Sequence, residues 1–186
     1  MEVGTIHIHT DLVNACKRGD RSAQYRMYQL YARAMFNICL RMLGDRPAAE
    51  DALQEAFVNV FRNIHLFEGR SSLGAWIKRI VVNKCLSHIR SEKMTMESLE
   101  GQHEHIPDTA EHPMADLPEL TPERINRAIA ELPEGCRVVF TLFQLEGYDH
   151  QEIADILNVS VSTSKSQLHR AKKLLHERLL QDKIRQ

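Results

Sequence analysis

A group of polar and basic side chains near the C-terminus has the spacing of one helical face that can contact DNA. Ser166, His169 and Arg170 follow Lys165 at distances of one, four and five residues, so a helix presents all four together. Lysine and arginine reach phosphates or guanine edges, while serine and histidine hydrogen-bond to bases. A solvated helix end with surface lysines is the alternative. The candidate DNA-reading residues are Thr163, Lys165, Ser166, His169, Arg170 and Lys173.

The residues before this face predict the turn that positions it. A helix containing Ile153 and Ala154 ends at Asn158, a residue type that tolerates a positive φ. Val159 and Val161 are expected to pack the turn into the core, and a second helix begins beside them. This pattern is a helix-turn-helix, in which the second helix enters the major groove. It favours DNA reading over the solvated helix end.

A second basic stretch lies in the first half of the chain. Residues 62–90 contain six basic residues against the single acid Glu68, a net charge of +5, together with Trp76 and a glycine-containing loop. Cations that follow the backbone and a pocket for an unstacked base suit a single nucleic-acid strand. For Trp76 itself we favour a place in the core, since a lone tryptophan at helical spacing is more often packed inside.

The overall charge conceals these two stretches. The chain has 24 basic and 25 acidic residues, a formal net charge of −1, which by itself argues against a nucleic-acid binder. The charges are segregated, however: residues 1–91 have a net charge of +5 and residues 92–118 one of −6. Residues 119–155 have a net charge of −5 and residues 163–186 one of +5. A nearly neutral chain is therefore compatible with two DNA-binding segments.

Apolar residues recur at intervals of three and four, which predicts an all-α fold of two small helical domains. Asp45 with Pro47 and Thr121 with Pro122 have the character of helix starts. We expect a first domain at residues 10–91 and a second at residues 119–182. Between them, residues 92–118 are acidic, contain three prolines and lack aromatic residues, so they are expected to form a flexible linker.

Several classes of protein are disfavoured. The N-terminus lacks the pattern of a secretory signal, and no segment has the length and apolar character of a membrane span, so a cytoplasmic protein without membrane insertion is expected. The four cysteines are widely spaced, which favours buried free thiols. Five histidines cluster in segments expected to be flexible, without zinc-site spacing: His7, His9, His103, His105 and His112. We expect no metal, cofactor or catalytic residue, hence no enzyme.

The residues of the first domain carry a family resemblance. The stretch Asp51–Phe57 (DALQEAF), the segment 67–80 and then Asn83 and Arg90 resemble region 2 of a bacterial sigma factor. The helix-turn-helix resembles region 4, and the chain as a whole resembles the extracytoplasmic-function class of the sigma-70 family. The resemblance covers about residues 10–90 and 119–181.

The resemblance implies partners and roles. The helix with DxxQExF would bind the clamp helices of the RNA polymerase β′ subunit, region 4 would meet the β flap, and an anti-sigma factor is an expected regulator. The implied polymerase-binding residues are Asp51, Gln54, Glu55, Phe57 and Phe61. The residues implied to melt and read the −10 promoter element are Arg70, Ser71, Lys78, Arg79, Asn83, Lys84 and His88. The DNA-reading residues named above would contact the −35 promoter element. Alternatively, Asp51 and Glu55 only favour the first half of their helix through its dipole.

Two positions depart from the family pattern. Ser164 and Gln167 stand where an aliphatic residue and an arginine are common in the family. Ser164 would weaken packing or free a hydroxyl group, and Gln167 removes a charge directed at phosphate, so the exact −35 sequence is open. The competing hypothesis is a free-standing helix-turn-helix regulator that dimerises and binds duplex operators without polymerase.

Overall fold

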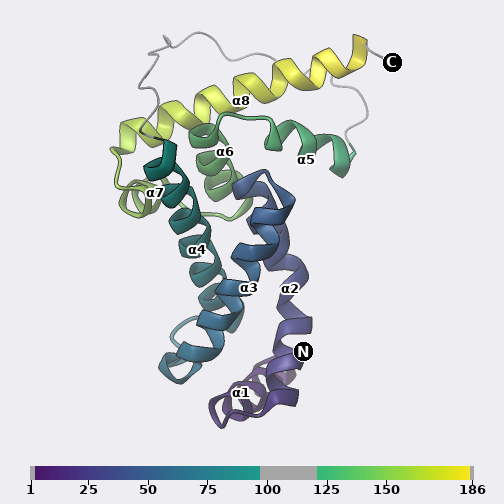
Figure 1. The fold of residues 1–186 in the computed structure, drawn as a ribbon, viewed down its shortest axis with the longest axis vertical. Helices are drawn as coiled ribbons and strands as arrows, with labels where there is room; N and C mark the ends of the chain where they lie inside the picture. The colour runs from purple at the N-terminus through teal and green to yellow at the C-terminus, as the bar shows by residue number, and fades with distance from the viewer. Residues whose placement is uncertain (1–2, 97–120, 185–186) are drawn as a thin grey trace. The chain divides into compact units, whose positions relative to one another are not determined.

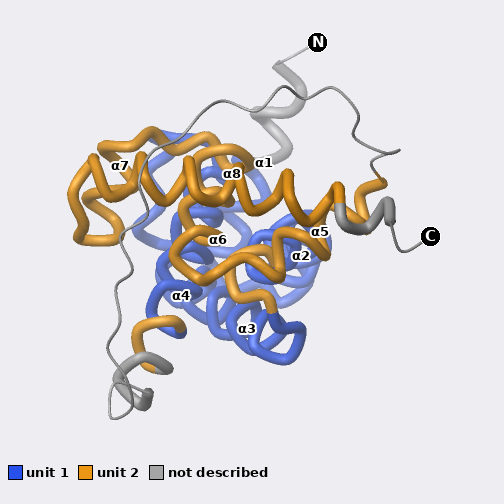
Figure 2. The backbone as a smooth tube through the Cα atoms, turned by 90° about the horizontal axis from the view of Figure 1, so that it is seen from above, with its two compact units in different colours: residues 1–40, 45–88 blue, residues 41–44, 89–186 orange. Residues whose placement is uncertain are grey.

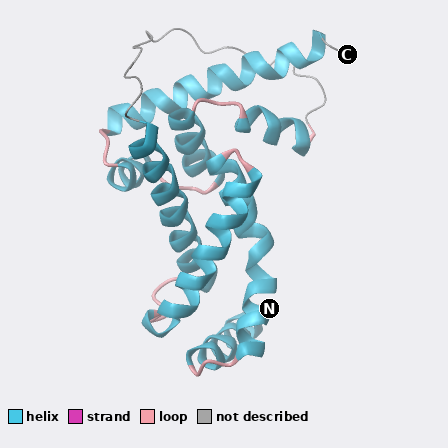
Figure 3. Cartoon of the chain, viewed as in Figure 1, coloured by secondary structure: helices cyan, strands magenta, loops and turns pink. Residues whose placement is uncertain are grey.

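The computed structural model describes residues 3–96 and 121–184, and every regular element in these two ranges is a helix (Figure 3). The first range contains α1 (Val3–Lys17), α2 (Arg21–Leu43), α3 (Arg46–Asn63), a 3-10 turn (Ile64–Leu66) and α4 (Leu73–Met96). The second contains α5 (Pro122–Ala130), α6 (Glu134–Phe140), a π-helical turn (Thr141–Leu145), α7 (His150–Leu157) and α8 (Val161–Ile184) (Figure 1). The predicted all-α class is confirmed.

The chain divides into two compact units, one of residues 1–40 and 45–88 and the other of residues 41–44 and 89–186 (Figure 2). Helix α4 continues to Met96, so the first five positions of the predicted linker, 92–96, are helical. The remainder of that linker, residues 97–118, lies outside the described residues.

Helices α2, α3 and α4 build the core of the first unit. Their inward faces bury Met27 and Met35 from α2, Val60 from α3, and Ile77 and Val81 from α4. Tyr28 of α2 meets Phe57 of α3 edge to face, with ring centroids 4.8 Å apart. Edge-to-face aromatic pairs add stability beyond the area they bury. The core therefore fixes the outward faces of α3 and α4.

Helix α1 was not predicted, and it includes His7 and His9. The helix buries Leu12, Val13 and Cys16, and it contacts the 3-10 turn that follows α3. Burial of an apolar face against the rest of the domain stabilises a helix whose sequence shows only weak helical periodicity. No helix in the described ranges combines the length and apolar character needed to cross a membrane.

Two predicted helix starts are confirmed. The Asp45 carboxylate accepts the backbone N–H of Ala48 at 2.9 Å, with Pro47 in the first turn of α3. The Thr121 hydroxyl accepts the backbone N–H of Arg124 at 3.4 Å, and Pro122 is the first residue of α5. In both cases the capping side chain satisfies a donor that the helix cannot satisfy itself.

The core of the second unit lies between α5, α6 and α8. It consists of Ala128, Ile129, Leu132, Cys136, Ala171, Leu175 and Leu179. The guanidinium of the half-buried Arg137 donates to the carbonyls of Ala130 and Leu132, at 3.2 and 3.1 Å, and so closes the end of α5. Burial lowers the pKa of Arg137. Helix α6 ends at Phe140, and a π-helical turn continues the chain from Thr141 to Leu145.

Candidate nucleic-acid interface

Three local backbone features define the helix-turn-helix. Asp149 and Glu152 form a reciprocal capping box at the start of α7, with both side-chain–backbone hydrogen bonds at 2.8 Å. Asn158 ends α7 with φ 55°, the left-handed conformation predicted for it. Ser160 then accepts the backbone N–H of Thr163 at 3.0 Å and starts α8. These contacts fix where α8 begins, and therefore which side chains its first turns present.

The DNA-reading residues predicted from sequence all lie on α8, mostly on its outward side. Thr163, Lys165, Ser166 and His169 are exposed. Arg170 and Lys173 are half-buried. We call these six residues the reading face. Its hydroxyls are already engaged within the helix, since Ser166 donates to the Thr163 carbonyl at 3.0 Å and Thr163 meets Ser160 at 2.8 Å.

The turn itself differs from the prediction in one respect. Val159 is 38% exposed and does not plug the turn into the core, and Val161 is half-buried. The core of the turn comes instead from Ile153 and Ala154 on α7 and Leu168 on α8, all three of which are buried. Because Asn158 turns the chain sharply, Val159 lies on the outside of the bend.

The residues predicted to bind polymerase lie on α3, but not all on its surface. Asp51, Gln54 and Glu55 are exposed, and Phe61 is half-buried. Phe57 is only 3% exposed and packs against Tyr28 and Phe61, so it is a core residue and not an anchor for a partner. The sequence prediction missed Val58, which is 47% exposed. Its spacing of seven, four and three residues from Asp51, Gln54 and Glu55 places it on the same face.

This difference in burial gives a test that separates neighbouring residues. Phe57→Ala is expected to cost about 3–5 kcal/mol in the free energy of unfolding, because it leaves a cavity in the core. Val58→Asp is expected to change that free energy by less than about 0.5 kcal/mol, since the position is on the surface. On the role that the sigma-factor resemblance implies for this helix, it is also expected to weaken binding of core polymerase. Urea unfolding and a core-binding assay measure the two effects. Equal stabilities for the two variants would contradict the burial described here.

The residues predicted to contact the −10 element lie on α4 and on the loop 67–72 before it. Arg70, Ser71, Arg79 and Asn83 are exposed. Lys78, Lys84 and His88 are half-buried. Arg70 Nε lies 2.7 Å from the Glu68 carboxylate. The Lys84 ammonium forms an ion pair with Glu55 of α3, so a residue predicted to meet DNA and one predicted to meet polymerase contact each other.

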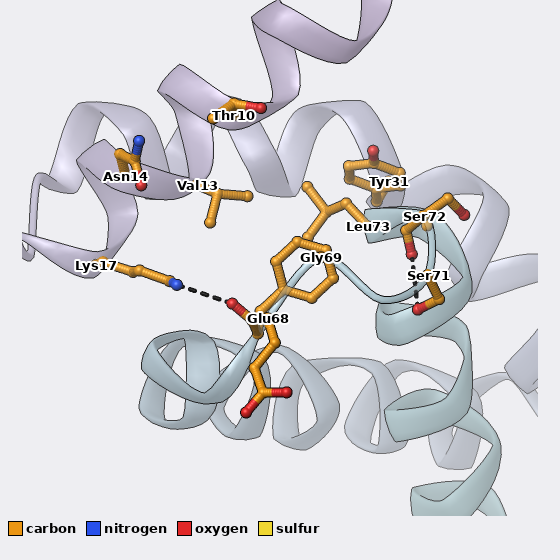
Figure 4. Close-up of a pocket in the computed structure, with 12 residues that line it drawn as sticks. Thr10, Val13, Asn14, Lys17, Tyr31, Glu68, Gly69, Ser71, Ser72 and Leu73 are labelled. Atoms are coloured by element: carbon orange, nitrogen blue, oxygen red, sulfur yellow. Dashed lines mark hydrogen bonds between the residues drawn. The ribbon is translucent and has the colours of Figure 1, made fainter.

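A pocket of about 670 Å³ lies between α1 and the loop 67–72 (Figure 4). Lys17 of α1 reaches the loop and donates to the Phe67 carbonyl at 2.8 Å, while the Glu68 carboxylate points away from α1. Gly69, at φ 76°, allows the loop to turn back. Tyr31 also lines the pocket, and burial raises the pKa of its hydroxyl. Sequence reasoning placed no role on α1, so Lys17 was missed.

Aromatic packing supports the same loop. The rings of Phe67 and Trp76 lie 5.4 Å apart, and Trp76 is half-buried, between the core position favoured for it and an exposed one. Phe67 also lines the pocket. The loop is therefore held on one side by an aromatic pair and on the other by a cation from α1.

Comparison with known proteins identifies this combination. The family model for sigma-70 region 2 matches residues 27–95, and the one for sigma-70 region 4 matches residues 123–175. The ECF RNA polymerase sigma factor SigW of Bacillus subtilis is 28% identical over 90% of this chain and 94% of its own length. The RNA polymerase sigma-H factor of Pseudomonas aeruginosa is 28% identical over 90% of this chain and 92% of its own length. The chain belongs to the extracytoplasmic-function class of the sigma-70 family.

Two solved structures share the fold. The sigma factor RpoE of Bartonella quintana, in complex with the anti-sigma factor NepR, matches 83% of this chain and 95% of its own, with a TM-score of 0.55 and 24% identity. CnrH, in complex with the cytosolic domain of CnrY, matches 92% of this chain and 96% of its own, with a TM-score of 0.53 and 19% identity. In this sigma factor, region 2 thus comprises α3, α4 and most of α2, and region 4 spans α5 to α7 and α8 as far as Leu175.

Proposed function

We propose that this sigma factor uses three surfaces in transcription initiation: the exposed face of α3, the loop 67–72 with α4, and the reading face of α8. The protein directs core RNA polymerase to promoters, and the polymerase itself performs nucleotide addition. Binding energy is the only contribution assigned to the sigma factor, so no residue has a catalytic role. Its place of action is the cytoplasm, where core polymerase works.

The face of α3 formed by Asp51, Gln54, Glu55 and Val58 is proposed to bind the clamp helices of the β′ subunit. It offers two carboxylates, one amide and one exposed apolar side chain along a single helix stripe. A helix that presents acceptors around an apolar anchor suits docking on another helix. Region 4 is proposed to meet the β flap, so both units of the chain contact polymerase.

The loop 67–72 and α4 are proposed to hold the melted −10 strand. The exposed Arg79 and Asn83 offer contacts to backbone and base, and the pocket beside the loop has a volume within the ~300–1,000 Å³ range of small-molecule sites. Lys17 and the neutral Tyr31 hydroxyl give this pocket polar groups for the edge of an unstacked base. Holding a base outside the duplex stabilises the open state.

The reading face of α8 is proposed to contact the −35 duplex in the major groove. Lys165 and His169 are exposed in the first turns of the second helix of a helix-turn-helix, which is the part that contacts base edges. Residues 10–91 and 119–182 are proposed as the two functional domains, with 92–118 as their linker. An anti-sigma factor that covers both domains is proposed as the regulator, in line with the complex of RpoE with the anti-sigma factor NepR.

The observation that carries this proposal is the presence of both sigma-70 regions in one chain, in sigma-factor order. Run-off transcription with core polymerase and a randomised promoter library tests it. We expect weak binding to duplex DNA by the sigma factor alone, and transcripts enriched for two separated sequence blocks once core enzyme is present. Tight operator binding by a dimer without polymerase, and no transcript from any template, would contradict the proposal.

A further inference from the structure

The inner face of α8 begins with two polar side chains before it becomes apolar. Ser164 is fully buried and Gln167 is half-buried, whereas the inward positions that follow, Leu168, Ala171 and Leu175, are apolar and buried. A buried hydroxyl or amide destabilises a core unless it is hydrogen-bonded. Both of these side chains have a partner on another helix of the same unit.

Ser164 pairs with His150, the first residue of α7. The Ser164 Oγ and the His150 Nδ1 lie 2.9 Å apart. One face of the imidazole is covered by Phe143 of the π-helical turn. The two rings are stacked, with centroids 4.4 Å apart and planes inclined by 23°. The imidazole is therefore held by the Phe143 ring on one face and by the Ser164 hydroxyl at its edge. The hydrogen bond links the start of α7 to the first turn of α8.

Gln167 pairs with Cys136 of α6. The Cys136 thiol donates to Gln167 Oε1, with the sulfur and oxygen 3.0 Å apart. Cys136 is 1% exposed, and burial raises the pKa of its thiol, so the thiol keeps its proton and remains a donor. A Cβ added at Gly135, near the start of α6, would lie 3.5 Å from the Gln167 side chain, so a larger residue at position 135 would touch it. The first turns of α8 are thus tied to both α7 and α6.

We propose that the His150–Ser164 and Cys136–Gln167 pairs set the rotation of α8 about its own axis and thereby determine base preference at the −35 element. This inference rests on the proposed function of the reading face. The paired residues of α8 alternate with reading-face residues: Thr163 and Lys165 flank Ser164 in the chain, and Ser166 directly precedes Gln167. A rotation of ~10° moves a group ~6 Å from a helix axis by about 1 Å, whereas site geometry must hold to about 0.5 Å.

Hydrogen bonds suit this task better than apolar contacts do. An aliphatic side chain packs almost equally well over a range of rotations, while a hydrogen bond weakens steeply when its angle changes. The four residues are positioning residues, since none of them lies on the reading face. Position 136 is far from its partner 167 in the chain, and position 150 is far from its partner 164, so no local sequence pattern reveals either pair.

The test measures base preference and not only activity. The full chain is assayed with core polymerase on templates with a randomised −35 element, and the ratio of the preferred base to the next is taken at each position. Ser164→Ala and His150→Ala are each expected to lower this ratio about fivefold at one or more positions, within the range of a base contact. The double variant is expected to match the single ones, because the two residues act as one pair. Gln167→Met is expected to act in the same way through the second pair.

Two variants serve as controls. His150→Asn keeps a polar atom near the position of Nδ1 and is expected to retain most of the wild-type preference. Glu131→Gln breaks the 3.0 Å ion pair with Arg178, which also joins α8 to another helix but far from the reading face, and is expected to leave the preference unchanged. Urea unfolding establishes that each variant is folded under assay conditions. If Ser164→Ala unfolds, His150→Ala and Gln167→Met still decide the outcome.

The outcomes separate the two levels of inference. A wild-type protein without preference at any −35 position would refute the reading role of α8. A wild-type protein with a preference that Ser164→Ala, His150→Ala and Gln167→Met all keep would overturn the positioning role alone. A loss of preference in Glu131→Gln equal to that in Ser164→Ala would also overturn it, since the effect would then follow from any loosening of α8.

Discussion

Replacing Asp51 and Glu55 with lysine is expected to lower sigma-dependent transcription at least about 100-fold while the chain stays folded. Both carboxylates are exposed on one face of α3, so their replacement removes no core contact. Like charges placed opposite each other across an interface cost several kcal/mol, which corresponds to a loss of this size. Glu55 also pairs with Lys84, so a lysine at position 55 would place two ammonium groups together on the DNA side. Core-binding affinity and run-off transcription measure the two consequences.

The matched control makes the same change in net charge elsewhere. Asp11→Lys with Glu177→Lys replaces two exposed carboxylates on α1 and α8 that lie outside both matched sigma-70 regions. We expect its core binding to stay within about twofold of the wild type, since surface substitutions away from a contact have small effects. If the Asp51/Glu55 variant binds core polymerase as tightly as this control, α3 is not the polymerase-binding helix.

Reversing the charge of Lys165 and Arg170 is expected to lower transcription about 100-fold on promoters that require a −35 element. Transcription should then no longer depend on the presence of that element, while binding of core polymerase stays intact. Each cation removed from a DNA interface weakens binding and lowers the salt dependence, and each glutamate added repels the phosphates. Arg170 is half-buried, so a thermal melt is needed to show that the double variant is folded. Transcription from promoters with and without a −35 element, at two salt concentrations, provides the measurement.

The control for this prediction lies on α2. Arg26→Glu with Arg33→Glu reverses two exposed cations outside the reading face and makes the same change in net charge. We expect it to preserve the difference between promoters with and without a −35 element. If the Lys165/Arg170 variant also preserves that difference, the reading face does not contact the −35 duplex.

Much of the architecture could be predicted because its signals are local. Asp45, Thr121 and Asn158 each act on backbone groups within three or four residues, and the structure confirms the helix starts and the turn that they predict. Helix α1 and the π-helical turn were not predicted. α1 depends on contacts with residues about fifty positions away, as the Lys17–Phe67 hydrogen bond illustrates, and such contacts leave no periodic trace in the sequence.

The candidate site was predicted less completely, for a related reason. A periodic pattern tells which residues share a face, but at the boundary of a face it does not decide burial. Phe57 and Val58 are neighbours on α3, and the contact of Phe57 with Tyr28 decides which of them is buried. Likewise, the sequence left two alternatives for Ser164, weaker packing or a free hydroxyl, whereas the structure shows the hydroxyl paired with His150.

The four buried cysteines have a practical consequence for spectroscopy. Cys16, Cys39, Cys85 and Cys136 are all free and buried. Burial raises the pKa of the Cys16 and Cys136 thiols, and the hydrogen bond with Cys39 together with burial raises that of Cys85. Since maleimide dyes react with exposed thiolates, these native thiols react slowly. A single cysteine introduced at an exposed position is therefore a selective attachment point for a fluorophore, without prior removal of the native cysteines from the packed interior.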